Sequence, residues 1–197
     1  MPPYTVVLDA CVLVPISLAD TLLRAAEKGL YRLLWSERIL AEAQQATEEI
    51  HPGVDVAKRF AHMRGAFDDA LVEGWEDLEA GITLPDSDDR HVVATTIRGG
   101  AHAIVTANLV DFPTSAIGPL GLRAIHPDDF LLDQLDLSPP TMLRVIQEQA
   151  AHTRRPPLTQ QDLTAVLGRA GAPASPTRSS ASRPHPSATA PDNPDAA

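Results

Sequence analysis

A continuous run of β-branched residues near the start of the chain constrains the fold more than any other feature. The segment TVVLDACVLV at residues 5–14 opens with such a run, which is typical of a strand buried on both faces of a parallel sheet. The segments AHAIVTAN at 101–108 and GLRAI at 121–125 predict a second and a third strand. Strands of this kind are joined through helices that pack on both faces of the sheet. We therefore expect an α/β fold with a parallel central sheet.

Helical periodicity marks most of the chain between these strands. Apolar side chains recur at helical spacing in four stretches, whose boundaries carry capping signals. Ser36 is placed to cap the second helix, and glycine closes the first and the last. The segment VEGWEDL at 72–78 is instead expected to form a short strand. The four predicted helices span residues 17–29, 37–50, 54–72 and 89–100.

Beyond residue 126 the pattern is helical only. Pro127 is placed to be the first residue of a helix over DDFLLDQL, and a second helix is expected over PPTMLRVIQEQAA. Thr159 and Asp162 resemble a capping box in front of QQDLTAVLG. After Leu167 the chain has no large apolar residue, so it cannot bury enough surface to offset its ordering entropy. The expected division is an α/β domain at 1–126, a helical segment at 127–168 and a disordered Pro/Ala/Ser-rich tail at 169–197.

Composition limits the class of protein. Hydrophobic residues make up 44% and charged residues 21% of the 197 residues, which excludes a wholly disordered chain. Cys11 is the single cysteine, so an internal disulfide framework and a cysteine-based zinc finger are excluded. The sequence has neither a membrane-spanning run nor the basic start of a signal peptide. The expected protein is soluble and cytoplasmic, with no membrane partner.

Carboxylates occur at the ends of the predicted elements. Asp9 follows the first strand, where functional groups of α/β sheets gather, and it either caps the next helix or belongs to a site. Glu42 borders the apolar stripe of its helix and is either an exposed helical residue or a ligand. Asp86, Asp88 and Asp89 precede another helix and exceed what capping requires. Their mutual repulsion favours a shared cation.

The segment VTANLVDFP adds Thr106, Asn108 and Asp111 just past the second strand. A turn explains these residues equally well. Together, three clusters of oxygen ligands without a rival cluster of cysteine or histidine fit a hard divalent cation, Mg²⁺ or Mn²⁺. The net charge of −10 argues against a nucleic-acid partner at first. It no longer excludes one if carboxylates hold a metal, because the metal presents a cation to the phosphate.

Four of these segments resemble the motifs of PIN-domain nucleases, specifically the VapC-type toxins that carry an extra C-terminal helical segment. VVLDACVLVP is similar to the first family motif, with Asp9 as its aspartate, and SERILAEAQQ is similar to the second, with Glu42. LPDSDDRHVVATTI is similar to the third, with Asp89, and AHAIVTANLVDFP is similar to the fourth. The resemblance covers about residues 4–168.

The chain departs from the family pattern at two positions. Many members have a hydroxyl or amide residue where this chain has Cys11. We interpret Cys11 as a small buried filler and not as a nucleophile, because no histidine is evidently paired with it. Many members have a fourth aspartate where this chain has Asn108. Either Asp111 takes over as the ligand, or Asn108 serves as a neutral oxygen ligand.

The resemblance implies a metal-dependent endoribonuclease with a PIN-like α/β/α sandwich. Asp9 and Asp89 would hold Mg²⁺ or Mn²⁺, with Glu42 and either Asn108 or Asp111 completing the site. A water molecule, oriented and acidified at the metal, would attack the RNA phosphodiester in line. The candidate substrate contacts are Arg38, Arg90, His91 and Thr106.

The resemblance also implies a small antitoxin encoded alongside as a partner, and homodimers are usual in the family. The stretch 68–89 has nine acidic residues and no lysine or arginine. It would attract a basic segment of such a partner, although a solvated acidic face explains it as well. The alternative function is a catalytically weak or silent PIN-fold binding module in a regulatory complex. A phosphatase of the haloacid-dehalogenase type is set aside, because it needs an aspartate at the position of Cys11.

Overall fold

A computed structural model describes residues 4–53 and 55–152 of the chain. Its centre is a sheet of four strands in the order β2-β1-β3-β4, and every neighbouring pair is parallel. The expected α/β fold with a parallel sheet is confirmed. β1 is buried along its whole length, as its continuous apolar run predicted. The strands are β1 (Thr5–Leu8), β2 (Arg32–Leu34), β3 (Ala103–Val105) and β4 (Arg123–Ile125).

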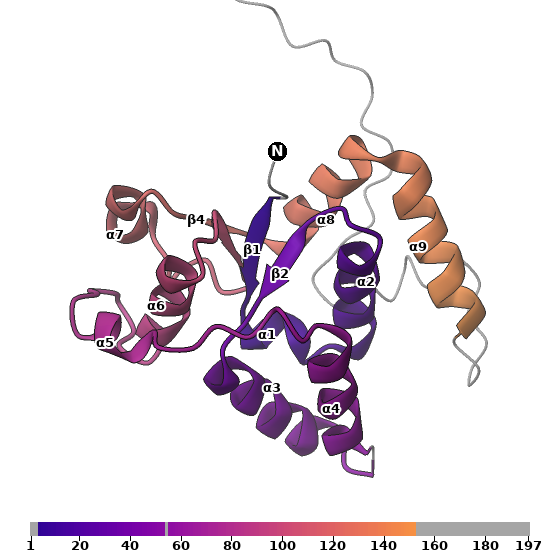
Figure 1. The fold of residues 1–197 in the computed structure, drawn as a ribbon, viewed down its shortest axis with the longest axis horizontal. Coiled ribbons are helices and arrows are strands. Elements are labelled where there is room, and N and C mark those ends of the chain that lie inside the picture. The colour runs from indigo at the N-terminus through magenta and orange to yellow at the C-terminus, as the bar shows by residue number, and fades with distance from the viewer. Residues whose placement is uncertain (1–3, 54, 153–197) are drawn as a thin grey trace, which may run out of the picture.

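Helices cover both faces of this sheet, which gives an α/β/α sandwich (Figure 1). Figure 1 shows α5, α6 and α7 on one side of the strands and α2, α8 and α9 on the other. Among residues 4–53 and 55–152, no helix has both the length and the apolar character that crossing a membrane requires. The helices are α1 (Ala10–Leu13), α2 (Ile16–Glu27), α3 (Glu37–Ile50), α4 (Val56–Ala66), α5 (Glu76–Glu79), α6 (Arg90–Arg98), α7 (Thr114–Ile117), the 3-10 helix η1 (Gly118–Leu120), α8 (Pro127–Leu137) and α9 (Pro139–His152).

Two segments differ from the sequence prediction. The strand expected at 72–78 is wrong, because Glu76–Glu79 form the short helix α5 and only Leu71 makes an isolated parallel bridge, to Trp35. The backbone turns at Gly74, which has a φ of 67°. Conversely, the three-residue strand β2 was not predicted. The helix expected at 54–72 ends earlier, at Ala66.

The C-terminal helices pack onto the same core as the sheet. α8 begins at Pro127, as predicted. Phe130, which is fully buried, meets the Tyr31 ring edge-on with 4.7 Å between ring centroids. Gln149 of α9 donates from its side-chain amide to the backbone oxygen of Ser17 on α2, at 2.8 Å. The helix predicted over 160–168 and the tail at 169–197 lie outside the described residues.

Candidate functional site

Asp9 lies where β1 ends and α1 begins, and it is 7% exposed. Its Oδ1 accepts a hydrogen bond from the backbone N–H of Ala10, at 2.7 Å. Its Oδ2 accepts one from the Thr106 hydroxyl, at 2.7 Å, and one from the Cys11 thiol, at 3.2 Å. Asp9 therefore caps α1, and it is also held by a side chain that follows the neighbouring strand. The two interpretations of Asp9 are compatible.

Thr106 follows β3, whose end is in register with the end of β1 through the pair Leu8 and Val105. The threonine is fully buried, so it is not available as a substrate contact in this structure. Besides donating to Asp9, its Oγ1 accepts the backbone N–H of Asn108, at 3.0 Å. The hydroxyl thus links the first acidic residue to the loop that carries the fourth motif.

The Cys11 thiol lies 3.3 Å from Thr106 Oγ1 and accepts the backbone N–H of Ala107. Burial, followed by the charge of Asp9, raises the pKa of this thiol to about 12. The protonated thiol is a weak nucleophile. Its place between two polar side chains agrees with the interpretation of Cys11 as a filler that supports Asp9.

Asp89 occupies the N-cap position of α6, yet its side chain makes no capping hydrogen bond. Burial and then the negative charges of Asp9, Asp111 and Asp86 raise the pKa of Asp89 to about 6, while His91 acts in the opposite direction. The carboxyl group of Asp89 is therefore electrostatically coupled to the carboxylates of two other segments. Repulsion of this kind is relieved when a cation binds between the groups.

Asn108 and Asp111 contact each other in the loop after β3. The side-chain amide nitrogen of Asn108 donates to Asp111 Oδ2, so the bond engages the amide nitrogen and not the carbonyl oxygen. Asn108 is exposed and Asp111 is half-buried. Both residues thus present oxygen atoms at the same loop, and the choice between them as a ligand stays open.

Glu42 is half-exposed on α3 and is held by two cationic or polar partners. Its Oε1 accepts from Nε of Arg38 at 3.1 Å, and its Oε2 faces Nε2 of His91 at 3.2 Å. Burial raises the pKa of Glu42, but the hydrogen bonds and charges of His91 and Arg38 outweigh burial, and the net pKa lies below its usual range. Glu42 is thus more than an exposed helical residue.

Within the described part of the chain, no three Asp, Glu, His or Cys side chains form a ready-made metal cluster. The donor set nonetheless fits a hard divalent cation, because Asp9, Asp89 and Asp111 supply carboxylate oxygens that repel one another. Glu42 is tied to Arg38 instead. Mg²⁺ or Mn²⁺ binding would require these side chains to rearrange.

The other predicted substrate contacts are largely engaged within the protein. Arg38 also bonds to Glu79, at 3.2 Å, and to the backbone oxygen of Asp88. His91 is 1% exposed and offers no surface to RNA, so the prediction of a substrate contact there is not supported. Arg90 is half-buried, and its Nε has no hydrogen-bond partner among the described residues.

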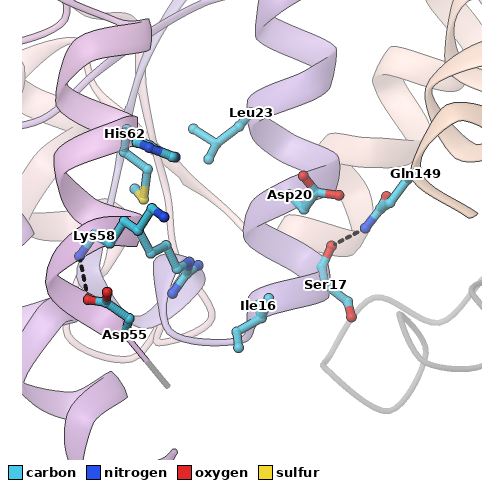
Figure 2. A pocket seen from close by; sticks show the side chains of 10 residues that line it. Ile16, Ser17, Asp20, Leu23, Asp55, Lys58, His62 and Gln149 are labelled. Carbon is cyan, nitrogen blue, oxygen red and sulfur yellow. Dashed lines mark hydrogen bonds between the residues drawn. The ribbon is translucent and has the colours of Figure 1, made fainter. Parts of the chain in front are cut away.

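A hollow of about 530 Å³ lies between α2 and α4, and none of the candidate metal ligands lines it (Figure 2). A second hollow of about 300 Å³ shares Asp20, Leu23, His62 and Met63 with the first, so the two form one groove. Figure 2 shows Leu23 of α2 facing His62 of α4. Sequence reasoning missed this groove, because the two helix faces that line it are separated by more than thirty residues in the sequence.

Comparison with known proteins agrees with this architecture. Residues 5–109 match the PIN domain, and residues 127–178 match the VapC50 C-terminal domain. The protein named "Putative ribonuclease VapC50" of Mycobacterium tuberculosis is 42% identical over 99 residues. The match covers 50% of this chain and 58% of that relative, so it spans less than two thirds of the relative's length. No solved structure matches the chain. Because the PIN-domain match runs from β1 to the loop after β3, more than half of the chain, the protein belongs to the PIN-domain family.

Proposed function

We propose that this protein is an endoribonuclease that depends on Mg²⁺ or Mn²⁺ and is the toxin of a toxin–antitoxin pair. One observation carries the proposal: burial and the charges of Asp9 and Asp111 raise the pKa of Asp89 to about 6. Carboxylates gathered to bind a cation have this property when no cation neutralises them. The name of the 42% identical relative, a ribonuclease, supports the same reaction class. We propose the cytoplasm as its location, because the proposed substrate is RNA.

Asp9 and Asp89 would hold the cation, and Glu42 with either Asn108 or Asp111 would complete the set. The bound cation supplies Lewis acidity toward a water molecule and neutralises charge on the scissile phosphate. The chain contributes preorganisation, since hydrogen bonds from the protein already fix both oxygens of Asp9. Placing the ligands in advance lowers the cost of assembling the site.

The test is cleavage of end-labelled RNA in the presence of Mg²⁺ or Mn²⁺. Wild type is compared with Asp9→Asn and with an EDTA-treated sample. Asp136→Asn serves as the matched control, because Asp136 is an exposed carboxylate on α8. We expect Asp9→Asn and EDTA each to abolish cleavage, and Asp136→Asn to leave it unchanged. Cleavage that survives both interventions would refute the proposed function.

A second candidate is a PIN-fold binding module with little or no catalysis. It is favoured by Asn108, which stands in place of an acidic ligand, and by the ion pair between Arg38 and Glu42. This candidate predicts no Mn²⁺ binding that Asp9→Asn abolishes, and RNA that stays intact under all conditions. The two candidates therefore differ in both the cleavage assay and the binding assay.

For the antitoxin partner, we propose the groove between α2 and α4 as the docking surface. Ile16 is 40% exposed at one end of the groove, and Leu23 lies half-buried along it. Nη1 of Arg59 is buried there without a hydrogen-bond partner among the described residues. An amphipathic segment with an acidic side chain would cover the apolar wall and lie near the positive charge of Arg59.

The docking proposal is tested with the small protein encoded beside this gene, co-expressed and purified through a tag on the toxin. We expect Ile16→Asp to abolish co-purification and to leave RNA cleavage intact. Leu137→Asp is the matched control, because Leu137 is also an exposed apolar residue, on α8. Equal co-purification of both variants would refute the groove as the docking surface.

A further inference from the structure

His91 connects α3, which carries Glu42, with α6, which begins directly after Asp89. It lies two positions after Asp89, within the first turn of α6. Its Nε2 lies 3.2 Å from Oε2 of Glu42, which belongs to α3. No other hydrogen bond or ion pair of the described chain joins α3 directly to an α6 side chain. The imidazole therefore sets where Glu42 sits relative to Asp89.

In the part of the chain that the structure describes, the buried ring of His91 makes one polar contact, which is with Glu42. The side chain is 1% exposed, and its ring centroid lies 5.9 Å from that of Trp75. Its Nδ1 is buried and has no hydrogen-bond partner within the described residues. Burial of an unpaired ring nitrogen costs free energy, so the position would favour an apolar side chain if packing were its only role. Within the described residues, the polar contact of the ring is the one with Glu42.

The other partner of Glu42 constrains it less. Arg38 is 37% exposed, and its guanidinium is shared among Glu42, Glu79 and a backbone oxygen. Exposed ion pairs of this kind contribute little. A buried imidazole on a short side chain, by contrast, holds its acceptor in a narrow range of positions. Of the two contacts, the one from His91 fixes the carboxylate.

We propose that His91 is a positioning residue, which donates from Nε2 to Glu42 and holds this carboxylate next to the first turn of α6, so that it can complete a divalent-cation site with Asp89. The inference rests on the proposed function, since it assigns a role within the same cation site. Removing a hydrogen-bond partner of a metal ligand typically weakens metal binding by about 10- to 100-fold. The same loss is therefore expected when the Nε2 donor is removed.

The experiment compares three substitutions of His91. His91→Leu removes the donor and fills the space with an apolar group. His91→Gln keeps an N–H donor near the position of Nε2, and His91→Asn places its amide nearer the position of Nδ1. Mn²⁺ affinity is measured by the EPR signal of the free ion, RNA cleavage is measured in parallel, and circular dichroism checks the fold. His152→Leu, an exposed histidine at the end of α9, is the control.

We expect His91→Leu and His91→Asn to weaken Mn²⁺ binding by about tenfold or more, and His91→Gln to bind within about threefold of wild type. If His91 had only a structural role, the substitutions would change the stability of the protein but not its affinity for Mn²⁺. If His91→Leu does not fold, the comparison of Gln with Asn decides. The inference is overturned if the folded variants bind Mn²⁺ as wild type does, or if Gln is no better than Asn. Wild type that neither binds Mn²⁺ nor cleaves RNA overturns the proposed function as well.

Discussion

Replacing Asp89 with asparagine is expected to stabilise the protein when no divalent cation is present. The pKa of Asp89 rises from an ordinary 3.8 to about 6 because of burial and the charges of Asp9 and Asp111. One pKa unit corresponds to about 1.4 kcal/mol, which gives about 3 kcal/mol in full. Solvent screens this partly exposed side chain, so about 1 kcal/mol is the expected gain. For a chain of this length, that gain raises Tm by about 3 °C.

The direction of the pKa shift of Asp89 determines how the stability difference between Asp89→Asn and wild type depends on pH. Because the folded-state pKa lies above the unfolded value, the ionised Asp89 destabilises the fold fully above pH 6, and this cost fades as the pH falls toward 4. Asn is always neutral, so the advantage of Asp89→Asn is expected at pH 7.5 and shrinks in acid. No side-chain capping bond is lost, since Asp89 makes none.

The assay is thermal unfolding in EDTA, followed by circular dichroism at pH 7.5 and at pH 4.5. Asp88→Asn is the matched control, because Asp88 is an exposed neighbour that is not among the charges acting on Asp89. Adding Mg²⁺ is expected to raise the Tm of wild type more than that of Asp89→Asn. The reasoning is refuted if Asp89→Asn at pH 7.5 is no more stable than Asp88→Asn.

Three further outcomes follow from the packing around the site. Thr106→Val should destabilise the protein by about 1–3 kcal/mol, because Oδ2 of Asp9 loses the closer of its two donors and keeps only the Cys11 thiol; urea unfolding measures this, and Thr106→Ser should restore most of the lost stability. Phe130→Ala should cost about 3–5 kcal/mol by opening a cavity against Tyr31, which a chevron or equilibrium titration would detect. Cys11 should react slowly with a thiol reagent at pH 8 because its pKa is raised to about 12. The prediction is contradicted if the thiol of the folded protein is labelled as fast as that of the protein unfolded in guanidinium.

Local signals account for the elements that the sequence predicted well. Ser36 caps α3 by accepting from the N–H of Ile39, at 3.3 Å, and Pro127 starts α8. Both signals act within one helical turn. β2 and the segment 72–78 were missed or misassigned, because pairing with distant segments decides them. Trp35 pairs with Leu71 across more than thirty residues, which no local pattern reveals.

The two glycines that end α6 have different physical reasons. Gly100 has a φ of 62° and its N–H donates to the backbone oxygen of Ile97, so it closes the helix in the left-handed conformation that favours glycine, as expected. Gly99 has a φ of −76°, which does not itself require glycine. A Cβ at this position would lie 2.6 Å from Cδ1 of Leu34 and 3.0 Å from Cγ2 of Val72. Close approach of the helix end to β2 therefore excludes a side chain. This constraint depends on a tertiary contact that the sequence does not display.

The candidate site likewise contains residues that the sequence predicted and contacts that it did not. Asp9 and Asp89 stood out because carboxylates at a strand end and a helix start are visible in the sequence. The contact of His91 with Glu42 was not foreseen, since the spacing within α6 separates His91 from Asp89 and says nothing about α3. A buried histidine beside a tryptophan is recognisable only after the helices have been placed.

The hydrogen bond from Thr106 to Asp9 has a consequence for the timing of assembly. Its two residues are 97 positions apart, and β3 is the strand that brings them together. A ribosome synthesises the chain from Asp9 toward Thr106, so a nascent chain that ends before β3 carries Asp9 without the threonine hydroxyl that holds its carboxylate. A translation product that stops before β3 therefore lacks part of the candidate site, however well its first helices fold. The order of the strands thus delays the appearance of the site until most of the domain has been made.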